Sequence, residues 1–269
     1  MINFFIYIFI LFNFQFAQDE IASGLYEEQL IEYIQNNYTT SNTENYNNAR
    51  DILYGEIYNN NGYVYGIYTN YSVELNDSDP STHLYENGMN CEHLWPQSMY
   101  EEQGDNSAMR CDMHHLRPCK ENVNSSRNNK PFSDIPDNQT ITWFWLTYSS
   151  NNIPSNNINE YSESGENAFE PREDMKGNIA RAMVYFYTMY SDVADNNFWE
   201  LQKETLFSWH LGDYPDIDEI NRTWAIASYQ QNKPNPFVID NSLIERIYFW
   251  EDILNGDINV DHSLDVLDL

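Results

Sequence analysis

The chain has 269 residues, of which 41% are hydrophobic and 16% aromatic, enough to bury a sizeable core and to exclude an intrinsically disordered protein. Its 42 acidic and 13 basic residues give a net charge of −29, which argues against binding of nucleic acid or anionic membranes over the whole surface. Contact with a polyanion must therefore be confined to a stretch where the local charge differs.

The first 17 residues are almost wholly apolar and give way at once to Gln18, Asp19 and Glu20. This pattern predicts a secretory signal peptide over residues 1–17, and hence a secreted or periplasmic protein. An uncleaved membrane anchor is the alternative, but the run is at the short limit for a membrane span and no basic residue precedes it. No second such run follows, so we expect a mature protein without a membrane anchor, whose main domain covers residues 18–254.

Apolar residues at helical spacing predict a helix over residues 25–34 at the start of the domain. Residues 52–69 are expected to form a β-hairpin, because two β-prone runs flank the turn signal over residues 59–62.

The second half of the chain reads as mainly helical. An aromatic-rich run over residues 141–148 fits a buried strand or a short helix, and the Asn- and Ser-rich residues 151–165 predict an exposed loop. Strands followed by helices indicate a largely helical α+β domain. Further helices are expected over residues 175–190, 217–229 and 243–254.

The chemistry-bearing residues are concentrated between positions 91 and 132. This window holds three of the six histidines, all three cysteines and five of the thirteen basic residues, and its five basic and six acidic side chains give a net charge of −1. Within it, residues 117–130 carry four basic residues and one acid. The surplus predicts a cationic strip that contacts an anion, unless it is a solvated helix face that happens to be basic.

Cys91, Cys111 and Cys119 are an odd number of cysteines for an exported chain. One disulfide and one thiol is the simplest expectation, with the pairing left open. A structural zinc site with the neighbouring histidines is the alternative, although no Cys-x-x-Cys pair is present.

Several side chains of this window have the chemistry of a metal-dependent hydrolase. If their segment is helical, Asn124, Arg127 and Asn128 share one face, at i, i+3 and i+4. Carboxylate and amide oxygens suit Mg²⁺ or Ca²⁺, an imidazole beside such a site can take a proton from water, and arginine matches phosphate oxygens. These parts suffice for metal-assisted phosphodiester hydrolysis. An ion pair of Glu92 and His93 on a loop is the alternative.

A series of short motifs occurs in a fixed order over roughly residues 22–250. They are Ala49–Gly55, Val64–Thr69, Asn90–Ser98, Asp112–Pro118, Val123–Asn128, Lys176–Met183 and Asn235–Phe237. In content and order they resemble the endonuclease I family of secreted and periplasmic nucleases. The resemblance implies a ββα-metal (His-Me finger) core embedded in a largely helical single domain. It also implies an endonuclease that cuts DNA, and often RNA, with little sequence preference and leaves 5′-phosphate ends. We expect the protein to be a monomer.

The resemblance also implies roles for individual residues, carried over by motif position, and one Mg²⁺ ion at the site. Arg110 is a candidate for the arginine that holds the product phosphate. The other assignments are His93 as general base, Glu92 and Asn124 as ligands of the Mg²⁺, Arg127 as a further catalytic residue, and His114 and Asn128 in supporting positions.

Two features depart from the expected pattern. In a regular strand Glu92 and His93 would point to opposite faces, so a strand end, bulge or loop must let both reach one site. Lys233 and Pro234 precede Asn235, where the family more often has Gly-Asn-Arg. The second departure puts a C-terminal contact in doubt, but not the chemistry.

Residues 255–269 form an acidic tail that resembles a partial dockerin calcium loop. The resemblance implies a Ca²⁺ ion and a cohesin-like partner, although His262 stands where glycine usually permits the turn. An acidic disordered tail is the alternative. The candidate Ca²⁺ ligands are Asp257, Asn259, Asp261, Asp265 and Asp268.

Two other functions fit the sequence. One is an extracellular ribonuclease of the same fold. The other is a secreted, non-enzymatic calcium-binding adhesion or scaffold protein, in which residues 91–132 would be a stapled loop. The second function explains the acidity more easily, but it does not explain why the motifs around Glu92 and Asn124 occur in one chain.

Overall fold

The structure is a computed structural model that describes residues 20–251, apart from 77, 101–103 and 105–106. The predicted signal peptide, residues 1–17, lies outside the described residues. The predicted calcium ligands Asp257, Asn259, Asp261, Asp265 and Asp268 lie outside them too, so both stay predictions. Within the described part, no helix has the length and apolar character needed to cross a membrane.

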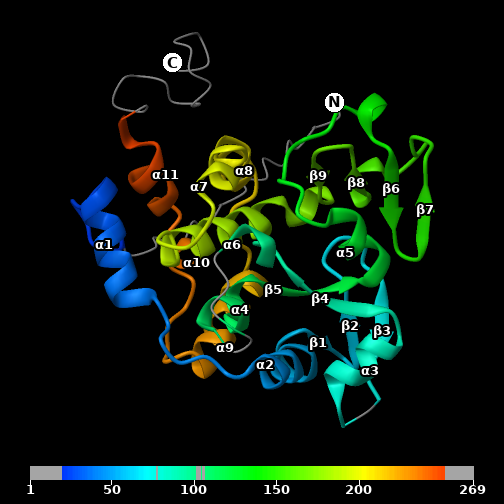
Figure 1. The fold of residues 1–269 in the computed structure, drawn as a ribbon, viewed down its shortest axis with the longest axis horizontal. Coiled ribbons are helices and arrows are strands. Elements are labelled where there is room, and N and C mark those ends of the chain that lie inside the picture. The colour runs from blue at the N-terminus through cyan, green and yellow to red at the C-terminus, as the bar shows by residue number, and fades with distance from the viewer. Residues whose placement is uncertain (1–19, 77, 101–103, 105–106, 252–269) are drawn as a thin grey trace, which may run out of the picture.

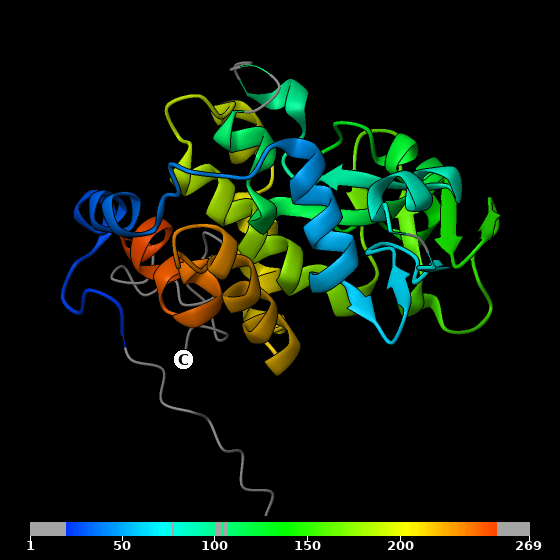
Figure 2. The same cartoon turned by 90° about the horizontal axis from the view of Figure 1, so that it is seen from below.

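A group of helices fills one side of the molecule and small sheets fill the other (Figures 1 and 2). At the centre of the helical side is α6, Lys176–Met189, which is buried along nearly its whole length because α1, α8 and α10 pack against it. The surrounding helices are α1 (Glu27–Tyr38), α7 (Asn196–Glu200), α8 (Lys203–Gly212), α9 (Ile217–Tyr229), α10 (Pro236–Ile239) and α11 (Leu243–Tyr248).

The sheets are antiparallel and short. One has the order β1-β2-β3 and another the order β7-β6-β8-β9. Their strands are β1 (Asn59–Asn60), β2 (Tyr63–Tyr65), β3 (Ser72–Glu74), β6 (Thr142–Trp145), β7 (Tyr148–Ser150), β8 (Ser162–Ser164) and β9 (Phe169–Glu170). Three further helices are α2 (Tyr46–Ile52), α3 (Pro80–Glu86) and α4 (Ala108–Cys111), and α2 packs against both of the others.

The residues of interest lie on a third, two-stranded unit between these parts (Figure 1). Strand β4, Met89–His93, pairs antiparallel with β5, Leu116–Lys120, and Glu92 stands opposite Arg117. Helix α5, Glu121–Arg127, follows β5 without a loop and packs on both strands. The order strand, strand, helix brings the end of β4 beside α5.

The mixed α+β class and three predicted helices, α1, α6 and α9, are confirmed. The hairpin over residues 52–69 is partly wrong. Its turn is present, since Asn61 and Gly62 have φ values of 52° and 87°, as a two-residue hairpin turn requires. Its first arm is a π-helical continuation of α2, Leu53–Ile57, because burying Leu53 and Tyr54 in a core outweighs the β-propensity of the run.

The later elements differ in their bounds. The aromatic run over residues 141–148 forms the hairpin of β6 and β7, which resolves the choice between strand and helix. The predicted loop over residues 151–165 is wrong at its end, where β8 pairs with β6. The last predicted helix, over residues 243–254, is interrupted by a bend at Phe249, which ends α11; residues 250 and 251 are helical again, and 252–254 lie outside the described residues.

The expected disulfide is wrong, since Cys91, Cys111 and Cys119 form no disulfide with one another. In the β4–β5 ladder Cys119 stands opposite Asn90, whereas Cys91 stands opposite Pro118. A shift of one residue in register places the two side chains on opposite faces of the ladder. The zinc alternative has no support either, because no group of three His, Cys, Asp or Glu side chains in the described part could hold a metal ion.

Candidate active site

A pocket of about 320 Å³ opens between the end of β4 and helix α5. It brings together five of the seven predicted active-site residues, without Arg110 and His114. Glu92 and His93 both reach it because His93 is the last residue of β4. Neighbouring residues in a regular strand point to opposite faces, and the end of β4 here lets both side chains reach one pocket. The residues that meet here are Glu92, His93, Asn124, Arg127 and Asn128.

Glu92 is 3% exposed, and its carboxylate is held from one side. The Tyr68 hydroxyl donates to its Oε1 at 2.7 Å, and the Arg127 guanidinium lies 3.3 Å from the same oxygen. Burial raises the pKa of Glu92, while Arg127 and Tyr68 oppose that rise. Because both partners occupy Oε1, Oε2 is the oxygen available to a ligand in the pocket.

The Asn124 side chain presents a second oxygen. Its amide nitrogen donates to the Cys91 carbonyl at 3.3 Å. This bond orients the amide group and leaves Oδ1 as the available acceptor. With Glu92 Oε2 this makes two hard oxygens in one pocket. The pair fits Mg²⁺, which binds through one or two protein ligands and completes its shell with water and substrate phosphate.

The His93 imidazole is fixed in one tautomer. Its Nε2 lies 3.1 Å from the Arg110 carbonyl, which can only accept, so Nε2 carries the proton and Nδ1 keeps its lone pair. The Gln97 amide donates to Nδ1 at 3.3 Å. Burial, then the neighbouring His115, lowers the pKa of His93 well below its usual range. The ring is therefore neutral at pH 7 and able to accept a proton at Nδ1.

Arg127 lies behind these groups, with its side chain 1% exposed. Its Nη2 donates to the Leu94 carbonyl at 2.5 Å and its Nη1 to the His93 carbonyl at 3.2 Å. The guanidinium therefore joins the end of β4 to α5 while it neutralises Glu92. The expected shared helix face is wrong for Asn128, because α5 ends at Arg127 and Asn128 has a φ of 52°.

The predicted cationic strip over residues 117–130 is wrong for its two arginines. Arg117 and Arg127 are 5% and 1% exposed, so their charges lie inside the protein. Lys120 and Lys130 are partly exposed, and their Nζ atoms are bonded to the carbonyls of Thr147 and Gly165. Half of the predicted strip is therefore absent from the surface.

His114 lies outside the pocket. Its Nε2 donates to the Lys233 carbonyl at 2.9 Å, and its ring packs edge-on against Tyr185 at 4.9 Å. The histidine that contacts His93 is His115, whose ring centroid lies 5.4 Å away. His114 thus links the segment before β5 to Lys233, one of the residues at which the sequence departs from the family pattern.

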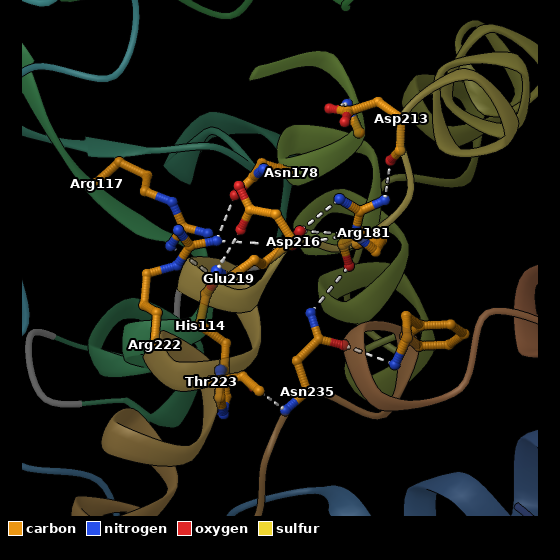
Figure 3. Close-up of polar contacts among 12 residues, drawn as sticks. His114, Arg117, Asn178, Arg181, Asp213, Asp216, Glu219, Arg222, Thr223 and Asn235 are labelled. Atoms are coloured by element: carbon orange, nitrogen blue, oxygen red, sulfur yellow. Dashed lines mark hydrogen bonds and ion pairs between the residues drawn. The ribbon is translucent and has the colours of Figure 1, made fainter. Parts of the chain in front are cut away.

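Figure 3 shows the polar network on which this part of the fold rests. The Arg181 guanidinium makes a two-pronged contact with the Glu219 carboxylate on α9, and the Asn235 amide donates to the Arg181 carbonyl at 3.1 Å. Arg222 donates to Asn178 in the same network. The downstream motifs therefore meet here and fix α6 against α9 and α10. The motif residues at these positions pack the fold together, and they do not line the pocket.

Sequence reasoning missed four side chains around the pocket. Tyr68 and Gln97 bond Glu92 and His93 directly, and Tyr46 stacks on His93 with ring centroids 5.5 Å apart. His115 is the fourth. Tyr68 and Gln97 lie inside motifs that carry the resemblance, so the signal was present, but their partners become visible only when the chain is folded.

Comparison with known proteins places the chain in a family. The model of the family described as Endonuclease I matches residues 15–242. The extracellular ribonuclease of Bacillus subtilis (strain 168) is 27% identical over an alignment of 169 residues that covers 55% of this chain and 50% of that protein. The extracellular ribonuclease of Bacillus amyloliquefaciens is 28% identical over an alignment of 162 residues, with the same two coverages. The chain thus spans about half the length of these relatives. With most of its length matched by the family model, it belongs to the endonuclease I family.

Proposed function

We propose that this protein is an exported, Mg²⁺-dependent endonuclease that hydrolyses phosphodiester bonds of DNA and RNA with little sequence preference and leaves 5′-phosphate ends. The observation that carries the proposal is the convergence of Glu92, His93 and Asn124 on one pocket in a chain of this family. In this proposal β4, β5 and α5 are the ββα-metal core. Export is supported by the apolar residues 1–17 and by the extracellular relatives.

The proposed mechanism assigns one task to each side chain. His93 Nδ1 takes a proton from a water that replaces the long Gln97 contact, and Nε2 stays bonded to the Arg110 carbonyl so that the ring keeps its direction. Glu92 Oε2 and Asn124 Oδ1 would hold a Mg²⁺ ion, which would stabilise charge on the scissile phosphate and on the leaving 3′ oxygen. Tyr68 and Arg127 hold Glu92 in place.

RNA is the competing principal substrate, because the relatives are named extracellular ribonucleases. Nothing in the three proposed catalytic side chains distinguishes the two sugars. The preference is therefore a question of relative rates on matched DNA and RNA strands.

The purified protein should nick supercoiled plasmid and degrade single-stranded RNA with Mg²⁺, and EDTA should abolish both reactions. His93→Ala should lower the rate by about 10²- to 10⁴-fold, the contribution of general base catalysis. His83→Ala is the matched control, since His83 bonds the Glu74 carbonyl at 2.9 Å and does not line the pocket. Fragments should be joined by DNA ligase without kinase treatment, because ligation needs a 5′-phosphate.

Two results would overturn this proposal. Unimpaired cutting by His93→Ala would refute the assignment of the base. A protein that binds Ca²⁺ and cuts neither substrate would favour the adhesion or scaffold alternative.

A further inference from the structure

A second pocket, of about 180 Å³, lies next to the candidate active site. The two pockets share Cys91 as a wall, and Tyr46 of the second pocket is the residue that stacks on His93. Arg50 and Tyr54 also line it. None of its lining residues is acidic, although the chain has 42 acidic residues. The pocket therefore offers an anion a cationic, acid-free position beside the catalytic histidine.

The placement of the basic residues makes Arg50 unusual. Six of the thirteen are buried: Arg117, Arg127, Arg172, Lys176, Arg181 and Arg246. Five others have their charged ends on carbonyl or carboxylate oxygens of the protein: Lys120, Lys130, Lys203, Arg222 and Lys233. Arg50 differs from these eleven because it lines the second pocket, where its guanidinium carbon lies 4.7 Å from the centre of the Tyr46 ring. A cation that could meet a substrate therefore lies beside His93.

Arg50 has unused hydrogen-bonding capacity. Its Nη2 donates to Asn47 Oδ1 at 2.7 Å, and it forms no ion pair with any described carboxylate. Its Nε is buried without a hydrogen-bond partner. Among the described residues, the buried Tyr54 hydroxyl has no hydrogen-bond partner except a weak one, the Cys91 thiol. Buried donors without partners are costly, so these groups are best explained by a ligand rich in acceptor oxygens.

Asn90 completes the pocket with an amide whose oxygen is buried and unbonded. The amide can turn its NH₂ group toward the pocket, because the two ends of the side chain have nearly the same shape. In that orientation it becomes another donor. A phosphate group, with acceptor oxygens on every side, would satisfy the guanidinium, the hydroxyl and the amide together.

We propose that this pocket is a subsite for a backbone phosphate that flanks the scissile one in the nucleic acid substrate, with Arg50 as its principal ligand. The inference rests on the proposed nuclease function and adds a second point of attachment. The volume is large enough for a phosphate group with some of its water, since one water occupies about 30 Å³. Because a phosphate carries no base identity, the subsite is compatible with cutting that has little sequence preference.

The test compares Arg50→Gln with the wild type on two substrates. A 12-residue single-stranded oligonucleotide has flanking phosphates, whereas a dinucleoside monophosphate has only the scissile one. Arg50→Gln should raise KM for the oligonucleotide about 10-fold, with kcat changed by less than about twofold, as expected for loss of a charge-assisted hydrogen bond in binding. Its activity on the dinucleoside monophosphate should be unchanged. Lys203→Gln is the control: it removes one positive charge from an exposed ion pair with Glu200 and should not alter the activity on either substrate.

Salt dependence and binding without cleavage give independent readouts. If Arg50→Gln loses one phosphate contact, a plot of the logarithm of the binding constant against the logarithm of the salt concentration should become shallower by about 0.7, the slope that each contact contributes on a single strand. The oligonucleotide should bind Arg50→Gln about 10-fold more weakly in EDTA, where no cutting is expected. Arg50→Lys keeps the charge but loses the planar guanidinium, so its affinity for the oligonucleotide should lie between those of the wild type and Arg50→Gln.

The outcomes separate this inference from the proposed function. A wild type that cuts, with Arg50→Gln equal to it on the oligonucleotide, would overturn the subsite and leave the nuclease standing. An equal loss on both substrates would place Arg50 in the catalytic centre and also overturn the subsite. Arg50-dependent binding by a protein that does not cut would retain the anion subsite and refute the nuclease.

Discussion

Replacing Arg127 with methionine tests whether this residue holds Glu92 or touches the substrate. The substitution keeps much of the side-chain volume but removes the guanidinium. Glu92 then loses its cation at 3.3 Å, and the carbonyls of His93 and Leu94 lose their donors. The sequence alone marked Arg127 as catalytic, whereas its burial favours a positioning role.

The expected cost follows from the burial of the pair. Arg127 and Glu92 have side chains that are 1% and 4% exposed, so removing one partner leaves a charge without solvent or counter-ion. Such a loss typically costs about 3–5 kcal/mol. For a domain of this size 1 kcal/mol corresponds to about 2–4 °C, so Tm should fall by roughly 6–20 °C.

Thermal unfolding and Mg²⁺ titration of the nuclease activity measure the two effects. Arg127→Met should lower both Tm and the apparent affinity for Mg²⁺, because Glu92 is no longer fixed. Adding Glu92→Gln to Arg127→Met should recover part of the lost stability, since the unpaired charge is then removed as well. Arg50→Met is the control and should change the free energy of unfolding by no more than about 0.5 kcal/mol.

A different result would refute this reasoning. If Arg127→Met keeps its Tm within about 1 °C but loses activity, the guanidinium does not stabilise the end of β4. Its role would then be contact with the substrate, as the sequence motif suggested.

Two further predictions concern stability away from the pocket. Gly177→Ala should lower the free energy of unfolding by about 2 kcal/mol or more, because the added Cβ would lie 2.1 Å from the Asp213 carbonyl oxygen. Gly212→Ala is the control: its Cβ would meet nothing within 4 Å, so calorimetry should find the protein unchanged or slightly stabilised. Burial, then the neighbouring Glu170, raises the pKa of Glu163 to about 7, so the stability it contributes is present below about pH 4.5 and is lost as the pH rises through about 7. Urea unfolding at pH 5 and pH 8 should therefore show that Glu163→Gln gains about 2 kcal/mol relative to wild type at the higher pH; an equal difference at both pH values would contradict the assignment.

The sequence could predict those parts of the fold that local patterns encode. Amphipathic spacing was sufficient for α1, α6 and α9, because each buries one face or is wholly enclosed. Asn61 and Gly62 were sufficient for a tight turn. The meeting of Glu92, His93 and Asn124 followed from motif content, although no helical or strand period alone would have brought them together.

The errors came from burial, which no local pattern reports. The run around Leu53 reads as a strand, yet packing makes it helical. The arginines at 117 and 127 count as surface charge in a sequence, yet both are inside. Tyr68 lies 24 residues before Glu92, and only the folded chain shows that its hydroxyl holds the carboxylate.

The placement of charge explains how an acidic body can accept a polyanion at this position. The candidate active-site pocket is lined by one carboxylate, Glu92, and one guanidinium, Arg127, which neutralise each other, and the adjoining pocket contributes Arg50 without any acid. Before a metal binds, therefore, the charged residues that line these two pockets sum to about +1, on a chain with a total charge of −29. A divalent cation held by Glu92 and Asn124 would add two more positive charges at the point where the scissile phosphate must lie. Substrate binding itself, and not the chemical step alone, should then depend on Mg²⁺.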